Sequence, residues 1–267
     1  MTEFIRGLIL GIVQGITEFL PVSSDGHLEL AKYILGDKSM GEDSLFMTIV
    51  LHVATTLSII VVFRKDIKDI FGGLLQFKWN AQTEFSAKVV VSMIPAVFVG
   101  LFFEAEIESL FSGRILLVAA MLAVSGLMLL LAHYFARDTD KPISYGNAFI
   151  IGIAQALAIA PGLSRSGSTI STSVLFGIDR NVAAKFSFLM VIPLILGKLA
   201  KDILDGQYSS QIENGTTLIV GFLAAFFTGL FACRLVLKVV QQSKLVYFAV
   251  YCFVVAIVAA AYILSKG

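Results

Sequence analysis

The segment from Glu18 to His27 carries much reactive chemistry for a chain that is apolar on both sides of it. It reads Glu-Phe-Leu-Pro-Val-Ser-Ser-Asp-Gly-His. Glu18 can hold a hard cation through oxygen or act as a base, and the imidazole of His27 can exchange protons near neutral pH. Ser24 lies three residues before His27, so an adjacent base could activate its hydroxyl as a nucleophile. We therefore expect Glu18, Ser24 and His27 to be catalytic.

Gln14 extends this cluster, because it lies four residues before Glu18 and shares a helix face with it. The pair predicts a site where Gln14 and Glu18 hold a divalent cation. Capping is the alternative for the serines and Asp25, because these residue types favour the start of a helix. For Ser23 and Asp25, capping explains the sequence as well as a role in the reaction does, and we also expect Ser23 to contact substrate.

A second polar segment, residues 161–169, reads Pro-Gly-Leu-Ser-Arg-Ser-Gly-Ser-Thr. Hydroxyl groups, glycines that admit backbone N–H groups, and a following helix N-terminus all favour an anion. Arg165 adds a guanidinium that matches phosphate oxygens, although a structural salt bridge is the alternative for it. Capping by Ser164 or Ser166 is compatible with binding. The predicted phosphate-binding residues are Arg165, Ser164, Ser166 and Thr169.

The elements that position these residues are apolar helices. Hydrophobic residues make up 57% of the 267 residues and charged residues 15%, which is too little polar surface for a soluble domain of this size. The composition predicts an all-α polytopic membrane protein, with residues 1–267 as one integral membrane domain. A net charge of +1 argues against nucleic acid as a partner. The six segments predicted to span are 44–63, 86–103, 115–136, 183–204, 217–237 and 245–264.

Both polar segments interrupt apolar regions that are too short to span. The arms are 4–20 and 27–36 around the first break, and 148–160 and 169–177 around the second. At about 1.5 Å per residue, such arms do not comfortably cross a hydrocarbon core of about 30 Å. We therefore expect two re-entrant pairs of half-helices with the polar residues at their tips.

The two broken regions also repeat each other in a constant register of 141 residues. This register predicts an internal duplication, with repeats at 1–136 and 145–267. Each repeat holds one re-entrant pair and three spans. Since three is odd, the second repeat starts on the opposite face, which makes the repeats inverted and lets the two tips meet near the middle. The matching residues are Gly11, Gln14, Ser23, Gly26 and Gly36 with Gly152, Gln155, Ser164, Gly167 and Gly177.

Loop charges orient the chain in the membrane. Lysine and arginine concentrate in the predicted loops 64–85, 137–144, 178–185 and 234–244 and are scarce in 37–43, 104–113 and 205–216. The positive-inside rule puts the basic loops in the cytoplasm, so that the first re-entrant pair opens outward. Carboxylate, hydroxyl, imidazole, arginine and a cation around an anion site indicate phosphoryl transfer. The natural substrate is a lipid with a phosphate head and a tail in the bilayer.

The two polar segments resemble the signatures of a known family. Gln14-Gly-Ile-Thr-Glu18, followed by Phe-Leu-Pro-Val-Ser-Ser-x-Gly-His27, is similar to the first signature of the undecaprenyl-diphosphate phosphatases, also called the bacitracin-resistance family, and residues 161–169 to the second. The resemblance implies a hydrolase of the bacterial inner (cytoplasmic) membrane. Such an enzyme removes the terminal phosphate of undecaprenyl diphosphate at an outward-facing site, recycles the carrier lipid for peptidoglycan synthesis and confers bacitracin resistance.

The resemblance also implies dependence on a divalent cation, Mg²⁺ or Ca²⁺. It marks as essential Glu18, Ser24, His27 and Arg165, with Gln14, Ser23, Ser164 and Thr169 in support. Two residues depart from the family pattern. Asp25 stands where Thr or Ser is usual, and His52 where many members have Gln. Asp25 could help to hold the cation, and His52, polar at depth, could line the cavity.

Three alternatives stay open at this point. A metal-activated water could replace Ser24 as the nucleophile. The chain could be a lipid-phosphate transporter or flippase, because inverted repeats with broken helices are a transporter architecture; the cluster of Glu18, Ser24 and His27 argues against a pure carrier. The expected partners are a polyprenyl diphosphate and membrane lipids, with a homodimer as the alternative to a monomer.

Overall fold

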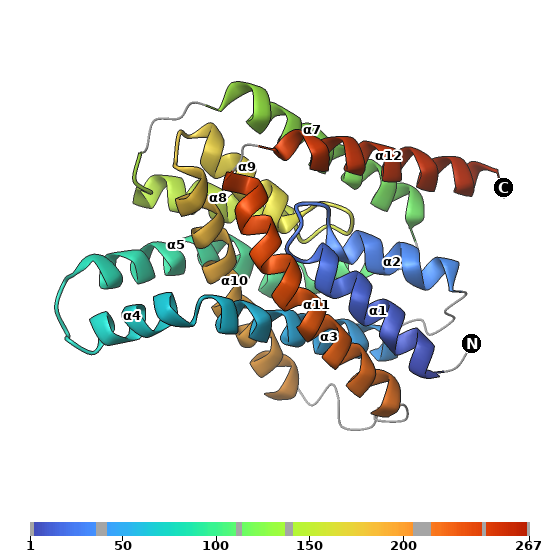
Figure 1. The fold of residues 1–267 in the computed structure, drawn as a ribbon, viewed down its shortest axis with the longest axis horizontal. Helices are drawn as coiled ribbons and strands as arrows, with labels where there is room; N and C mark the ends of the chain where they lie inside the picture. The colour runs from blue at the N-terminus through green and yellow to red at the C-terminus, as the bar shows by residue number, and fades with distance from the viewer. Residues whose placement is uncertain are drawn as a thin grey trace.

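A computed structural model describes residues 3–35, 42–110, 114–136, 141–204, 215–241 and 244–265 of the chain. These residues form an all-helical protein (Figure 1). The helices are α1 (Glu3–Thr17), α2 (Ser24–Ile34), α3 (Glu42–Val62), α4 (Arg64–Leu74), α5 (Ala81–Phe102), α6 (Glu104–Leu110), α7 (Ile115–Phe135), α8 (Tyr145–Leu157), α9 (Arg165–Leu175), α10 (Arg180–Leu204), α11 (Gly215–Gln241) and α12 (Leu245–Leu264). Gly36 and large parts of the predicted loops 37–43, 137–144 and 205–216 lie outside the described residues.

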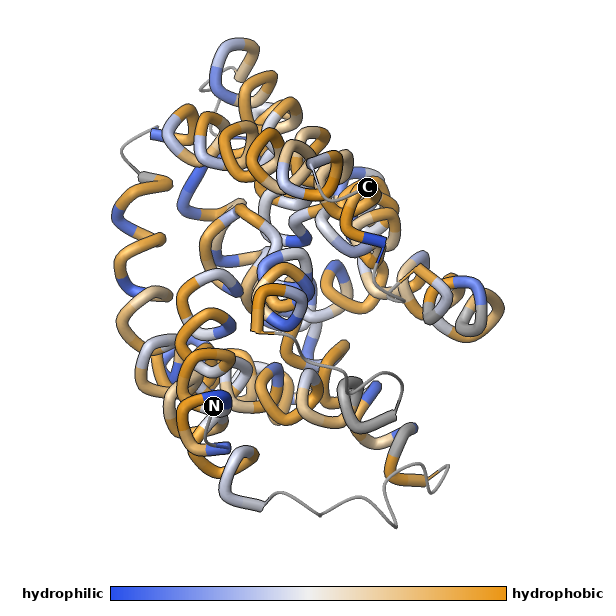
Figure 2. Tube along the Cα trace, turned by 90° about the vertical axis from the view of Figure 1, so that its right-hand side faces the viewer, coloured by the Kyte–Doolittle hydropathy of each residue, from blue (hydrophilic) through white to orange (hydrophobic). Residues whose placement is uncertain are grey.

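The long helices confirm a multi-pass membrane protein. Helices α5, α7, α10, α11 and α12 are long and apolar enough to cross a membrane, and α3 together with α4 makes a sixth candidate. Only 17% to 44% of the residues in the apolar windows of the five single helices are buried inside the protein. The remaining apolar side chains face outward, along the outer helices coloured orange in Figure 2, which suits contact with lipid.

The structure corrects several of the predicted loops; α11, for example, continues to Gln241, inside the predicted loop 234–244. The loop predicted at 64–85 contains α4, which follows α3 after Phe63 at an angle of 78°. The predicted loop 104–113 contains α6, and α10 begins at Arg180, inside the predicted loop 178–185. Helix α4 packs Ile67 and Ile70 against the core, while its charged residues other than the partly buried Asp66 stay exposed. An amphipathic helix of this kind has too low a mean hydropathy to stand out as a span.

The short helices begin earlier than the hydropathy predicted. Helix α2 starts at Ser24 rather than at 27, and α9 starts at Arg165 rather than at 169. The hydroxyls of Ser23 and Ser164 accept hydrogen bonds from the N–H groups of Gly26 and Gly167, at 3.2 and 3.0 Å. These two caps place the polar residues that follow them in the first turns of α2 and α9. These candidate reactive groups therefore lie on helices rather than in loops.

The turns of the two broken regions pack directly against each other near the centre of the molecule (Figure 1). A Cβ atom added to Gly26 would lie 2.9 Å from the Cα of Gly162, and one added to Gly167 would lie 3.2 Å from the oxygen of Pro21. Gly162 has φ +94°, a conformation that favours glycine. This close approach brings residues 18–27 and 161–169 into one site.

Candidate active site

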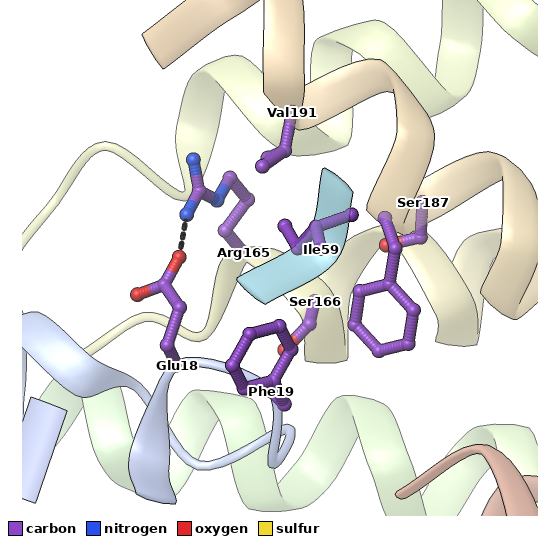
Figure 3. A pocket seen from close by; sticks show the side chains of 8 residues that line it. Glu18, Phe19, Ile59, Arg165, Ser166, Ser187 and Val191 are labelled. Carbon is purple, nitrogen blue, oxygen red and sulfur yellow. Dashed lines mark hydrogen bonds and ion pairs between the residues drawn. The ribbon is translucent and has the colours of Figure 1, made fainter. Parts of the chain in front are cut away.

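Glu18 is the centre of the site. It follows α1 directly, and its side chain is 4% exposed. Its Oε1 pairs with the guanidinium of Arg165, the first residue of α9, as Figure 3 shows. Its Oε2 accepts hydrogen bonds from Ser24 Oγ at 2.5 Å and from Gln14 Nε2 at 3.0 Å. A buried carboxylate needs such partners to offset its desolvation, and here they come from both polar segments.

Ser24 lies next to a base, but that base is Glu18 rather than His27. The imidazole of His27 folds back on the cap of α2, with Nδ1 2.8 Å from the carbonyl oxygen of Ser23. Its Nε2 lies 2.9 Å from the hydroxyl of Tyr251 on α12. The proposed pairing of Ser24 with His27 is therefore absent from this conformation. The spacing of three residues places both on one helix face, but the cap carbonyl and Tyr251 bind the two ring nitrogens.

The starts of α2 and α9 face a common cavity of about 20 Å³. A volume of this size holds about one water molecule. Ser164 also donates its backbone N–H to Ser125 Oγ at 2.8 Å, and the hydroxyls of Ser164 and Ser166 lie 3.4 Å apart. The lining residues are Thr17, Glu18, Ser23, Ser24, Asp25, Leu163, Ser164, Arg165 and Ser166. All predicted catalytic and phosphate-binding residues except His27 and Thr169 thus meet here.

Thr169 is fully buried and lines neither this cavity nor the second one. Its hydroxyl lies 2.9 Å from the Arg165 carbonyl oxygen and 2.6 Å from Ser187 Oγ on α10. The second cavity, of about 10 Å³, lies beside the Glu18–Arg165 pair and is lined mainly by apolar side chains such as Phe19, shown in Figure 3. Thr169 therefore ties the start of α9 to α10 and contacts the site through Arg165.

The two departures from the family pattern face each other. His52 Nε2 lies 3.4 Å from Asp25 Oδ1 and 3.5 Å from Glu18 Oε2. Its Nδ1 lies 2.8 Å from the Thr48 carbonyl oxygen, so Nε2 is the nitrogen that faces the site. His52 thus contacts two residues of the site, although the lining of neither cavity includes it. Tyr251 was not predicted, since one tyrosine in an apolar helix carries no signal of its own.

The residues present fit a hard cation. Gln14 is fully buried, and its Oε1 has no hydrogen-bond partner within the described chain. A buried carbonyl oxygen without a donor is a ligand that Mg²⁺ or Ca²⁺ would satisfy, and the N–H side of the same amide lies against the Glu18 carboxylate. Among the described residues, no group of three or more His, Cys, Asp and Glu could hold a metal ion. The protein therefore offers few ligands, and Mg²⁺ commonly takes its others from substrate phosphate and water.

Comparison with known proteins identifies the family of this chain. Residues 7–258 match the family described as "Bacitracin resistance protein BacA". The chain is 57% identical to the undecaprenyl-diphosphatase of Christiangramia forsetii, over 96% of this chain and 97% of that protein. It is 44% identical to the undecaprenyl-diphosphatase of Bacteroides fragilis (96% and 97%) and 38% identical to that of Methanococcus vannielii (97% and 100%). The chain therefore belongs to the family of the bacitracin resistance protein BacA.

Proposed function

We infer that this chain is an undecaprenyl-diphosphatase, a membrane hydrolase that converts undecaprenyl diphosphate to undecaprenyl phosphate and inorganic phosphate. One observation carries the inference: the Glu18 carboxylate holds both Ser24, a candidate nucleophile, and Arg165, a candidate phosphate ligand. Relatives of that name match the whole length of the chain. In the cell this activity would recycle the carrier lipid for peptidoglycan synthesis and confer bacitracin resistance.

Substrate binding would start with an exchange of partners at Arg165. The cavity holds about one water molecule, so it is too small for a diphosphate while Arg165 is paired with Glu18. The terminal phosphate would take the place of Glu18 on the guanidinium, supported by the N-terminus of α9 and the hydroxyls of Ser164 and Ser166. The exchange frees one oxygen of Glu18 while the other stays on Ser24.

In the proposed reaction, Ser24 Oγ attacks the terminal phosphorus and passes its proton to Glu18. The bond from phosphorus to the bridging oxygen breaks, and undecaprenyl phosphate leaves. Water then attacks the phosphoserine and gives a proton to His27, while the Ser24 oxygen takes back the proton from Glu18 as phosphate departs. Direct attack by water on the diphosphate is the variant, in which Ser24 only orients substrate.

Gln14 and Glu18 would hold a divalent cation, Mg²⁺ or Ca²⁺. When bound, such a cation neutralises charge on the phosphates. The support for this site is the unpartnered Oε1 of Gln14, which belongs to the amide whose Nε2 lies 3.0 Å from the carboxylate. Turning the Gln14 amide about its last bond would point this oxygen toward the position where its N–H group now meets Glu18.

We also propose that residues 1–136 and 145–267 are inverted repeats with re-entrant pairs α1–α2 and α8–α9. Helix α1 packs on α11, and α8 packs on α5. A Cβ atom at Gly11 would overlap the carbonyl oxygen of Gly221, and one at the equivalent Gly152 would overlap that of Ser92. Such reciprocal contacts between small residues are expected when two repeats exchange their packing partners.

The turns of the two broken regions provide a second reciprocal pair of contacts, which supports the proposed repeats. Ser125 of α7 donates a hydrogen bond to the carbonyl oxygen of Gly162 at 3.2 Å. Cys252 of α12 donates one to the carbonyl oxygen of Pro21 at 3.8 Å. Pro21 and Gly162 are 141 residues apart, the register of the duplication. Each repeat thus supports the tip of the other.

We place the protein in the cytoplasmic membrane with its active site facing outward, on the strength of the loop charges. The first helix begins and the last helix ends on the same side of the molecule (Figures 1 and 2), as an even number of spans requires. A homodimer stays a prediction. Light scattering of the purified protein in detergent would test it.

Release of inorganic phosphate by the purified protein tests the proposed function. The substrate is undecaprenyl diphosphate in detergent, with Mg²⁺ or with a chelator, and Arg165→Ala is the control variant. We expect release only by the unchanged protein and only with the cation. If the folded, unchanged protein released no phosphate with either Mg²⁺ or Ca²⁺, the hydrolase would be excluded and the transporter would be the remaining candidate.

A further inference from the structure

We propose that Tyr251 is a positioning residue that holds the imidazole of His27 for proton transfer. The proposal rests on the function inferred above, in which His27 exchanges a proton with water. The Tyr251 hydroxyl lies 2.9 Å from Nε2 of His27. The two rings also stack, with centroids 5.6 Å apart and planes 11° from parallel. The hydrogen bond and the stacking fix the ring together.

The partner atoms determine which nitrogen carries the proton. The carbonyl oxygen of Ser23 can only accept, so Nδ1 must be the N–H donor across 2.8 Å. In the neutral ring, Nε2 then has a lone pair, and the Tyr251 hydroxyl must donate to it. When His27 gains a proton, Nε2–H donates to the same oxygen, because a hydroxyl both donates and accepts. Tyr251 can therefore hold the ring before and after proton transfer, and its hydroxyl must turn aside from the Nε2 lone pair while the proton arrives from water.

A structural role does not explain this tyrosine well. Tyr251 is 44% exposed, so its ring adds little to the core. Helices α2 and α12 are already joined further along by Tyr33 and Tyr262, whose rings meet edge to face with centroids 6.2 Å apart. The hydrogen bond from the Tyr251 hydroxyl to His27 therefore adds an orienting contact beyond the joining of the two helices.

The contact also crosses between the halves of the chain. His27 lies in the first turn of α2, and Tyr251 lies 224 residues away in α12. Ser24 and Glu18 come from the first half, whereas Arg165 comes from the second. With Tyr251, the second half would provide both the phosphate ligand and the orienting group for the imidazole. In metal sites and catalytic triads, the group that orients a histidine fixes its tautomer and direction in this way.

The test compares Tyr251→Phe, which keeps the ring and removes the hydroxyl, with Tyr247→Phe. Tyr247 lies one turn earlier on α12 and is 67% exposed, so it controls for loss of a tyrosine hydroxyl on this helix. We expect kcat for phosphate release to fall about tenfold in Tyr251→Phe, the lower end of the effect of removing an orienting partner. KM should change little, because Tyr251 does not reach the cavity. Tyr247→Phe should match the unchanged protein.

A double-mutant cycle shows whether Tyr251 acts through His27. In a His27→Gln background, Tyr251→Phe should cause no further loss, since the group that it orients is gone. Equal losses in both backgrounds would overturn the proposal. So would a Tyr251→Phe variant as active as the unchanged protein. Failure of the unchanged protein to release phosphate would instead overturn the proposed function.

Nitrogen NMR gives a readout that is independent of activity. The chain has three histidines, so ¹⁵N labelling of histidine and comparison with His27→Gln identify the His27 signals. We expect the Nδ1–H tautomer to dominate in the unchanged protein and in Tyr247→Phe, and to mix with the other tautomer in Tyr251→Phe. The same tautomer and line width in all three proteins would also contradict the positioning role.

Discussion

Glu18 and Arg165 form an ion pair across 147 residues of sequence, at the point where the two broken regions of the chain meet. Glu18 also accepts hydrogen bonds from Ser24 and Gln14 of its own broken region, and Arg165 is the first residue of α9 in the other. The pair thus joins the group that would accept a proton to the group that would bind phosphate. In the proposed function, an anion would open the site by competing for the guanidinium.

Replacing Arg165 should remove activity and weaken the fold. Arg165→Ala leaves the Glu18 carboxylate buried without its cation, which costs about 3–5 kcal/mol in comparable buried pairs. Phosphate release should fall at least about 100-fold, the effect of removing one preorganised charge-stabilising donor. Arg165→Lys keeps the charge but loses the planar fork, so intermediate activity is expected. Phosphate release and thermal unfolding in detergent check both effects, and full activity in Arg165→Ala would rule out the phosphate role.

Ser24→Ala distinguishes the nucleophile from the metal-activated water. If Ser24 attacks phosphorus, its loss should lower phosphate release by about 10³-fold or more, as for other covalent nucleophiles. Ser23→Ala is the matched control. It removes the cap of α2, worth about 1 kcal/mol, and leaves the Ser24 hydroxyl on Glu18. Substantial turnover by Ser24→Ala, under conditions where Ser23→Ala is folded, would favour direct attack by water.

Gln14 tests the cation site. Gln14→Met keeps the size of the side chain but removes the oxygen, so half-maximal activity should need at least about tenfold more Mg²⁺, the usual effect of losing a metal-site contact. Gln14→Glu adds a carboxylate ligand and should need less Mg²⁺ than the unchanged protein. Titration of phosphate release with Mg²⁺ after treatment with a chelator measures both. Identical Mg²⁺ dependence in all three proteins would exclude Gln14 as a ligand.

His52 and Asp25 should behave as a pair. In His52→Gln, the Asp25 carboxylate loses its imidazole partner at 3.4 Å and faces the incoming phosphates without it. We expect a KM raised several-fold, because the repulsion between two like charges a few ångströms apart in water is about 1 kcal/mol. Adding Asp25→Ser should restore the KM. A KM that stays high in the double variant would show that His52 acts on substrate independently of Asp25.

The contact between the two turns should tolerate no side chain. Gly26→Ala places its Cβ 2.9 Å from the backbone of Gly162, so one turn must move and the site must open. Both stability and phosphate release should fall. Gly100→Ala on α5 is the control: no atom lies within 4 Å of its Cβ position, and alanine favours a helix by up to about 1 kcal/mol. The unfolding temperature should therefore fall in Gly26→Ala and stay the same or rise in Gly100→Ala. Only Gly26→Ala should lose activity.

Hydropathy and residue type were sufficient to predict the six candidate spans and the gathering of Glu18, Ser24 and Arg165. Both predictions depend on the burial of apolar residues and on the free-energy cost of unpaired polar groups in lipid. Both effects can be read from the local sequence. The helix starts were missed because a cap depends on which serine meets which N–H group. The base beside Ser24 was assigned to His27 because spacing along a helix does not show that a cap carbonyl binds the ring. The contact of Tyr251 with His27 could not be predicted from local sequence, because the two residues are 224 positions apart.

The interlocked turns have a consequence for how the enzyme is made. Pro21 and Gly26 pack against residues of the 161–169 segment, the Pro21 carbonyl oxygen also accepts a hydrogen bond from Cys252, and Arg165 and Tyr251 come from the same later part of the chain. A nascent chain that has inserted only α1 to α7 has no partner for its first tip. The active site is therefore finished late in biogenesis, and two separately expressed halves should be inactive alone and gain activity when they assemble in one membrane.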